Sequence, residues 1–387
     1  MRTKLTELAL LFFKLGTTAF GGPAAHIAMM QNEVVRRRAW MTEQEFLDLI
    51  SACNLIPGPN STEMAIHIGH RQAGWPGLLV AGLCFILPST AIVLALAWAY
   101  VQYSQLPAVS HLMNGIKPII IAIILQTFIS LSRTALRNGF LRFLCLLVLG
   151  LCFYYENQLV LLLAGGAASL LWSAKQEKPI GKMSRVLTVL GLLLALSLTS
   201  ALTARSPAHL ETADTTFSLQ SLFLYFLKLG SVLYGSGYVL IAFLRVDLVE
   251  QRHWLSSDQL LDATAAGQVT PGPVFTTVTF IGYLLGGSYG AALATLGIFL
   301  PAFFFVAITA PFISKLRKSK IASATIDGIN ASSLALMAFV TLELGRDSLT
   351  RPLFIGESAV AALLLWKYNI NPTWLILAGA LIGLLAQ

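Results

Sequence analysis

Long apolar runs alternate with short charged stretches along the chain, and their lengths predict helices that cross a membrane. A membrane-crossing helix needs about 20 mostly apolar residues. In the first half, the runs near this length are 78–101, 115–132, 140–155 and 158–174. Their partners in the second half are 290–313, 328–345, 353–366 and 373–386, and a further run between the halves is 186–203. We therefore expect nine full helical spans if the broken segments described next are re-entrant, and more if those segments also cross.

Four other apolar segments are interrupted by glycine or proline. The segments are 8–31, 50–72, 219–244 and 262–285. The breaks are Gly21-Gly22-Pro23, Pro57-Gly58-Pro59, Gly235-Ser236-Gly237 and Pro271-Gly272-Pro273. Proline lacks an amide donor and clashes with the preceding turn, so Pro-Gly-Pro cannot continue a helix. Inside a membrane such a break persists only where protein or water satisfies the freed backbone groups. We expect half-helices or re-entrant hairpins at these places.

The same features recur at a fixed distance, which indicates a tandem duplication. The stretch FFKLG at 12–16 returns as FLKLG at 226–230, and the first Pro-Gly-Pro returns as the second, both 214 positions later. After one deletion, Leu87-Pro88 matches Leu300-Pro301 at 213 positions. We expect repeats at 1–185 and 219–387, joined by a linker helix and loop at 186–218.

The basic residues predict that the two repeats are inverted in the membrane. Lys and Arg concentrate in cytoplasmic loops. The first half has such a cluster at Arg36–Arg38 and none in the loop 102–111, whereas the second half has Lys315, Arg317, Lys318 and Lys320 after the equivalent span. Loops at matched positions of the two repeats therefore differ in Lys and Arg content as if they lay on opposite sides of the membrane. The single run 186–203 supplies the one additional crossing that inverts the second repeat, provided that each repeat crosses an even number of times.

Composition excludes several classes of protein. Of 387 residues, 56% are hydrophobic and 11% charged, whereas a soluble domain carries about 25% charged residues. A soluble enzyme, a disordered protein and a nucleic-acid-binding domain are excluded, although the net charge is +8. The four cysteines show no metal-ligand spacing, so we expect neither a metal nor a cofactor. Glu7 and Lys14 interrupt the first apolar run, so we do not expect a cleaved signal peptide.

The broken helices are the candidate binding sites. The start of a half-helix offers unpaired amide groups and a partial positive charge, which suits an anion. The candidate residues are Gly21, Gly22, Asn54, Pro57, Gly58, Pro59, Asn60 and Ser61 in the first half, and Gly235, Gln268, Pro271, Gly272, Pro273 and Thr276 in the second. The alternative is that Pro-Gly-Pro is an ordinary loop between short helices.

Two lysines occupy matched positions inside apolar segments. Lys14 and Lys228 each lie shortly before a glycine break. Ionisable residues inside a membrane are costly and point to function, and this pair could hold a divalent anion between the repeats. The alternative is that each long side chain reaches the membrane surface. Glu33 and its counterpart Asp247 we interpret as structural.

Glu63 and His67 are candidates for proton transfer. Their spacing places them on one face of the helix after the first Pro-Gly-Pro, and Thr277 and Ile281 replace them in the second half. Burial can bring either group to titrate near neutrality. His26 could join them. The alternative for the two histidines is a polar contact between helices.

Several long stretches resemble the chromate ion transporter family. They are FFKLGTTAFGGPAAHIAMM, EVVRRRAW, NLIPGPNSTEMAIHIGHRQAGWPG and FILPS, repeated as FLKLGSVLYGSGY, GQVTPGPVFTTVTFIGY and GIFLPAF. The resemblance covers both halves and implies the long, two-domain form, with multiple spans of the inner membrane. It implies export of chromate, driven by protons. The second half departs from the first where Ser236-Gly237 replaces Gly22-Pro23.

The expected fold is therefore an all-α integral membrane protein of two homologous, inverted repeats. Its expected ligand is chromate or a sulfate-like oxyanion, with no nucleic-acid partner, and a homodimer stays open. The residues do not distinguish chromate from sulfate, since both are tetrahedral dianions.

Two competing functions are an intramembrane enzyme that uses Glu63 and His67, and a channel. No HExxH motif in the sequence supports the enzyme, and two residues on one helix face are a thin site. Paired broken helices argue against an always-open pore. A transporter is therefore the function that the sequence favours.

Overall fold

All regular elements that the structure describes are helices. The computed structural model describes residues 5–20, 22–104, 106–155, 157–176, 217–234, 237, 239–310, 320–368 and 370–385. Within these ranges no strand occurs. The expected all-helical class is therefore confirmed.

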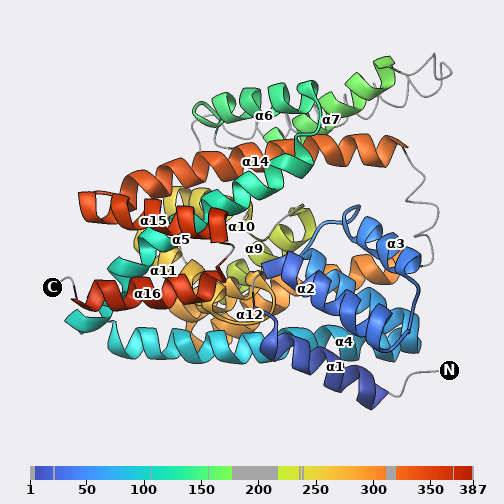
Figure 1. Cartoon of the computed structure of the whole chain (residues 1–387), viewed down its shortest axis with the longest axis horizontal. Coiled ribbons are helices and arrows are strands. Elements are labelled where there is room, and N and C mark those ends of the chain that lie inside the picture. Colours follow the sequence, from blue (N-terminus) through green and yellow to red (C-terminus); the bar gives the residue numbers. More distant parts are fainter. Residues whose placement is uncertain are drawn as a thin grey trace.

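The two halves contain the same helices in the same order, apart from the short η3 of the second half (Figure 1). The first half has α1 (Leu5–Thr18), α2 (Gly22–Gln31), η1 (Asn32–Arg37), α3 (Glu43–Cys53), α4 (Asn60–Tyr103), α5 (Pro107–Ala135), α6 (Gly139–Cys152) and α7 (Gln158–Gln176). The second half has α9 (Leu219–Val232), α10 (Val239–Leu244), η2 (Arg245–Gln251), α11 (Ser257–Val269), η3 (Val274–Thr276), α12 (Thr277–Thr309), α14 (Lys320–Ser348), α15 (Pro352–Tyr368) and α16 (Pro372–Leu385). The order of elements agrees with the duplication.

Local sequence explains why matched helices begin at matched residues. Thr42 caps α3 in a capping box with Glu45, and Ser256 caps α11 in the same way with Gln259. Each box satisfies two amide groups that a helix start leaves free. The predicted breaks follow: α3 ends at Cys53 before the first Pro-Gly-Pro, and α11 ends before the second.

The longest helix of each half is a half-helix joined to a full helix at a sharp kink. In α4 the kink lies at Ala73 and Gly74, where Gly74 has φ 66°. In α12 it lies at Gly286 and Gly287, where Gly287 has φ 60°. Glycine adopts a positive φ without steric cost. The two limbs meet closely: a Cβ on Gly69 or Gly77 would overlap the backbone of the other, and Gly282 and Gly290 repeat this contact.

The number of full spans is smaller than the sequence predicts. Across the described ranges, four helices are long and apolar enough to cross a membrane: Asn60–Tyr103, Pro107–Ala135, Val274–Thr309 and Ile321–Ser348. Helices α6, α15 and α16 have 14, 17 and 14 residues. At 1.5 Å per residue they reach about 21–26 Å, less than the roughly 30 Å of a bilayer core. The expected spans at 140–155, 158–174, 353–366 and 373–386 are therefore not among these four helices. The expected linker helix at 186–203 lies outside the described residues.

The two halves pack against each other through their long helices. Helix α4 contacts α12, and α5 contacts α14. In Figure 1 the partners run in opposite directions: α4 ends at the left and α12 at the right, while α5 rises to the right and α14 returns to the left. Glycines permit the closest contacts, such as Gly115 of α5 against Gly379 of α16 and Gly165 of α7 against Gly328 of α14.

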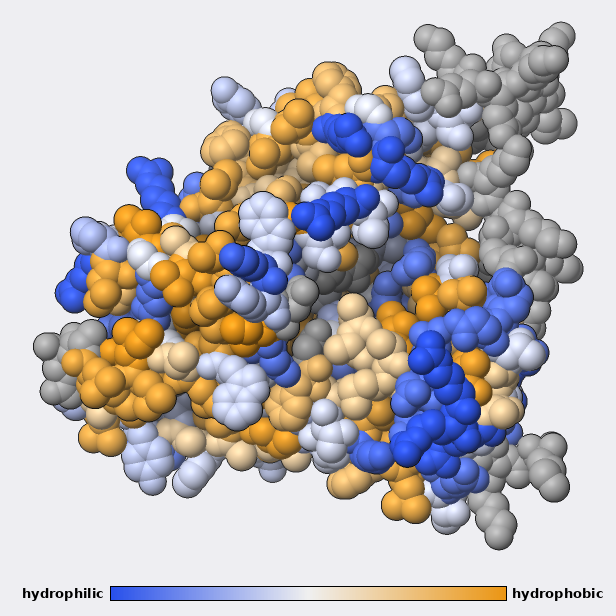
Figure 2. Space-filling view, in the orientation of Figure 1, coloured by the Kyte–Doolittle hydropathy of each residue, from blue (hydrophilic) through white to orange (hydrophobic). Residues whose placement is uncertain are grey.

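The surface is that of a membrane protein. Large apolar side chains are exposed, among them Trp98, Phe143, Leu146, Trp366 and Trp374. Figure 2 shows broad hydrophobic areas, with hydrophilic residues gathered over the region of α1 to α3. A bilayer satisfies such a surface, which water would not.

Candidate functional site

Each Pro-Gly-Pro turn donates a backbone hydrogen bond to the residues just before the glycine break of the other half. The amide of Gly58 donates to the carbonyl of Leu233 at 2.8 Å, and the amide of Gly272 donates to the carbonyl of Ala19 at 2.9 Å. Ala19 and Leu233 are matched positions of the duplication, so the exchange is reciprocal. It satisfies backbone groups that the breaks leave free, as a membrane interior demands.

Each turn also packs against the long helix of the other half, so that this contact too is repeated in both halves. A Cβ on Gly272 would lie 2.8 Å from the Cβ of Ser89 on α4. A Cβ on Gly58 would lie 3.7 Å from the Cβ of Ala302, the counterpart of Ser89, on α12. Ser89 and Thr276, both buried, share a hydrogen bond of 3.0 Å. The structure therefore brings the predicted residues Gly58, Gly272 and Thr276 to one centre between the halves.

Glu63 lies at this centre without a hydrogen-bond partner among the described residues. Its side chain is 0% exposed, and both carboxyl oxygens lack a partner. It touches the first turn, since a Cβ on Gly58 would overlap Oε1 of Glu63. An unpaired buried carboxyl group is costly to ionise, which suits a group that binds and releases a proton.

The two predicted histidines are also buried. The Nε2 atom of His26 donates to the carbonyl of Ala19 at 3.0 Å, the same carbonyl that accepts from Gly272. His67 is 2% exposed, and its Nε2 atom has no partner within the described part of the chain. His26 is thus linked through Ala19 to the turn of the second half.

The two predicted lysines lie beside acidic residues of their own halves. Lys14 is 59% exposed, and its Nζ lies 3.6 Å from Oε1 of Glu33. Although burial raises the pKa of Glu33, the hydrogen bond from Arg37 and nearby positive charges, including Lys14, lower it below its ordinary value. Lys228 is exposed, and its charge acts on Asp247, the counterpart of Glu33. This placement agrees with the alternative in which the lysines reach the membrane surface.

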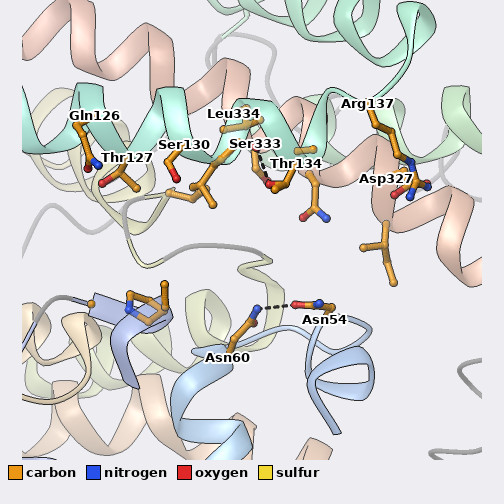
Figure 3. Close-up of a pocket in the computed structure, with 18 of the residues that line it drawn as sticks. Asn54, Asn60, Gln126, Thr127, Ser130, Thr134, Arg137, Asp327, Ser333 and Leu334 are labelled. Atoms are coloured by element: carbon orange, nitrogen blue, oxygen red, sulfur yellow. Dashed lines mark hydrogen bonds and ion pairs between the residues drawn. The ribbon is translucent and has the colours of Figure 1, made fainter. Parts of the chain in front are cut away.

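A cavity of about 740 Å³ opens beside the breaks of the first half (Figure 3). One wall contains the predicted residues Gly22, Asn54 and Asn60. Asn60 donates to Asn54 at 2.8 Å. The opposite wall is formed by polar residues of α5 and α14 and by Arg137, which follows α5. The residues of the two helices are Gln126, Thr127, Ser130, Thr134, Ser323, Asp327, Asn330 and Ser333. Neither Lys14 nor Lys228 is among the residues that line it.

The residues of this second wall are not among those predicted from the sequence. The signal is present in the spacing, because 126, 130 and 134 recur every four positions and so share a face of α5. The apolar run 115–132 has the pattern of an ordinary span, which conceals the polar stripe at its end.

The remaining predicted residues frame the centre rather than the cavity. Pro57, Pro59, Ser61, Pro271 and Pro273 are buried, and Gln268 is half-buried. Gly21 and Gly235 lie outside the described residues.

Comparison with known proteins identifies the family. The family model described as "Chromate transporter" matches residues 6–170 and again 220–384. A chromate transport protein of Cupriavidus metallidurans is 31% identical over 99% of this chain and 93% of its own. A probable chromate transport protein of Synechococcus elongatus is 32% identical over 94% of this chain and 90% of its own. A chromate transport protein of Pseudomonas aeruginosa is 30% identical over 97% and 91%.

No solved structure matches the chain. The relatives are named as transporters, which is consistent with a protein that is not an enzyme. Because the family model covers both halves and the similarity to these relatives extends over nearly the full length, the chain belongs to the chromate transporter family.

Proposed function

We propose that this protein is a secondary transporter that exports chromate across the inner cell membrane, driven by protons. Its family makes it a membrane transporter; direction, coupling and location are the proposal. The observation that carries it is the reciprocal hydrogen bonding of Gly58 and Gly272 across the halves. Paired broken helices at a repeat interface are where secondary transporters bind substrate.

The proposal includes inversion of the two halves. The opposite directions of α4 and α12, and of α5 and α14, support it. The opposite placement of basic loops in the sequence supports it independently. Inversion lets one half open while the other closes around the same central site.

Chromate reaches the centre through the cavity of the first half. Gly22, Asn54 and Asn60 line this cavity, and the first amides of α4 follow Pro59. Those amides and the partial positive charge of the helix start attract a dianion. The buried prolines on either side fix the shape of the turn.

Glu63 carries the proton in this proposal, with His67 and His26 nearby. Its carboxyl group touches Gly58, so a change in its charge acts on the turn that holds the two halves together. Proton binding and the exposure of the anion site are coupled in this way.

Transport into proteoliposomes tests the function. Purified protein is reconstituted, and uptake of radiolabelled chromate is measured with an acidic interior, with no pH gradient and with the gradient reversed. Protein-free liposomes are the control, and unlabelled sulfate is added as competitor. We expect chromate to accumulate against its gradient when protons flow outwards.

Three results would contradict parts of the proposal. Uptake equal to that of empty liposomes refutes chromate transport, and uptake indifferent to the pH gradient refutes proton coupling. Conductance far above carrier turnover refutes a carrier. Export is tested in cells, which should accumulate less chromate when they express the protein; greater accumulation refutes the direction.

A further inference from the structure

We propose that the polar wall of α5 and α14 binds the oxyanion through neutral hydrogen-bond donors, with Gln126, Ser130 and Ser333 as principal contacts. This inference rests on the proposed function and adds residues on the side of the cavity opposite the breaks. Figure 3 shows the two walls facing each other, with Asn54 and Asn60 on one side and the α5 residues on the other.

The chemistry of the cavity suits an anion that must be released again. Among the described residues, its lining contains several hydroxyl and amide groups but a single cation, Arg137, which is ion-paired with Asp327. The pair leaves little net charge at the end of the cavity. Neutral donors recognise a tetrahedral oxyanion without the tight hold of several cations, and transport requires both binding and release.

Ser333 supplies an observation that points to a ligand. It is 2% exposed, and its hydroxyl has no hydrogen-bond partner among the residues described. A buried hydroxyl without a partner is unfavourable, so a ligand oxygen in the cavity would satisfy it.

The second half shows why the anion binds beside α5 rather than at the matched place on α14. The counterparts of Ser130 and Thr134 are Glu343 and Asp347. Carboxylates at these positions repel an oxyanion, whereas hydroxyl groups donate to it. At these matched positions the first half therefore has hydroxyl donors on α5, and the second half has carboxylates on α14.

Chromate binding to the purified protein in detergent tests this site. Ser333→Ala and Gln126→Leu should each weaken the chromate Kd about 3- to 10-fold, the effect of one neutral hydrogen bond. Ser130→Asp should abolish measurable binding. Ser332→Ala is the matched control, because Ser332 is a buried neighbour with an unpartnered hydroxyl, among the described residues, that does not line the cavity. It should bind as the parent does.

The outcomes separate this inference from the proposed function. If the parent transports and binds chromate but Ser333→Ala and Ser130→Asp keep its Kd, the neutral-donor site is wrong and the function stands. If the parent neither binds nor transports chromate, the proposed function itself fails. If Ser332→Ala and Ser333→Ala have equal thermal unfolding temperatures, a difference in their chromate Kd is not caused by a difference in folding.

A different observation carries a second inference. We propose that the ion pairs of Arg245 keep closed the place in the second half that corresponds to the cavity of the first half; we call these ion pairs the latch. Its side chain is 7% exposed and touches three carboxylates. Nε lies 3.0 Å from Oε1 of Glu250, Nη1 lies 2.9 Å from Oδ2 of Asp347, and Nη2 lies 3.5 Å from Oε2 of Glu343.

The latch occupies the place that the cavity occupies in the first half. Helix α10 packs directly on α14, whereas residues of α2 and α5, their counterparts, face the cavity. The residue matched with Arg245 is Gln31. One half is therefore open and the other closed, as expected for one end state of alternating access.

Cysteine accessibility in membranes tests the latch. In a background with the four native cysteines replaced, Val340→Cys reports the closed side and Thr127→Cys, its counterpart, reports the cavity. A charged maleimide should label Thr127→Cys quickly and Val340→Cys slowly. Adding Arg245→Gln, the residue of the first half, should raise the labelling rate of Val340→Cys at least about tenfold and lower that of Thr127→Cys.

The opposite movement of the two rates is the diagnostic result. A variant that merely unfolds would raise both rates, which would overturn the latch. Unchanged labelling of Val340→Cys with Arg245→Gln would overturn it as well. Glu250→Gln keeps two of the three carboxylates and should give an intermediate rate.

Discussion

The close seat of Gly272 predicts a measurable loss of stability on substitution by alanine. Gly272 has φ 89°, and an added Cβ would lie 2.8 Å from the Cβ of Ser89 and 3.2 Å from the carbonyl oxygen of Gly16. The strained φ costs about 1–3 kcal/mol for a residue with a side chain. Crowding a packed site adds about 1–3 kcal/mol. Gly272→Ala should therefore lower the free energy of unfolding by about 2–6 kcal/mol.

Gly74→Ala is the control that separates the two contributions. Gly74 also has a positive φ, at 66°, but an added Cβ meets nothing within 4 Å. It should lose only the conformational part, about 1–3 kcal/mol. Both substitutions restrict the unfolded chain equally, so the difference between them measures the close approach of the turn.

Unfolding in mixed micelles, followed by loss of helical circular dichroism, provides the measurement. Gly58→Ala should lose less stability than Gly272→Ala, because its Cβ would overlap only the end of the Glu63 side chain, which can shift. If Gly272→Ala loses no more stability than Gly74→Ala, the turn is not seated against α4 as described.

Three further predictions concern charges and helix starts. Glu63→Gln should keep chromate exchange between equal pH values but lose the response of transport to a pH gradient; a response equal to that of the parent would remove Glu63 from the proton path. Lys14→Ala combined with Lys228→Ala should leave chromate transport in proteoliposomes unchanged, because neither lysine lines the cavity; loss of transport by a folded double variant would restore the lysines as anion ligands. Thr42→Ala should destabilise the protein by about 1 kcal/mol in the same unfolding assay, because it removes the capping group of α3; no loss would show that the cap is not formed.

Much of the architecture could be predicted because it is local. Pro-Gly-Pro stops a helix wherever it occurs, so the breaks at Pro57-Gly58-Pro59 and Pro271-Gly272-Pro273 follow from the residues alone. The duplication is visible as a constant offset. The ends of helices such as α6 and α16 are less predictable, because an apolar run of 14 to 16 residues does not reveal where tertiary packing ends it.

The partners across the halves could not be predicted. Nothing near Gly58 in the sequence indicates that its amide donates to Leu233, since that pairing depends on how the repeats assemble. The same holds for the polar stripe of α5, which becomes the wall of a cavity only when α14 and the first break enclose it. The rarity of mid-run charges favours Lys14 as an anion ligand, yet Glu33 lies within reach of its flexible side chain.

The exchange between Gly58 and Leu233, and between Gly272 and Ala19, has a consequence for the order of folding during synthesis. The first half leaves the ribosome before its hydrogen-bonding partners in the second half exist. Until those residues are made, the carbonyl of Ala19 has His26 as a partner, but the amide of Gly58 lacks the carbonyl of Leu233, a costly state inside lipid. The turn at Gly58 therefore completes its backbone hydrogen bonding only after the second half has been made, and we expect the central site to form as a late step of biogenesis.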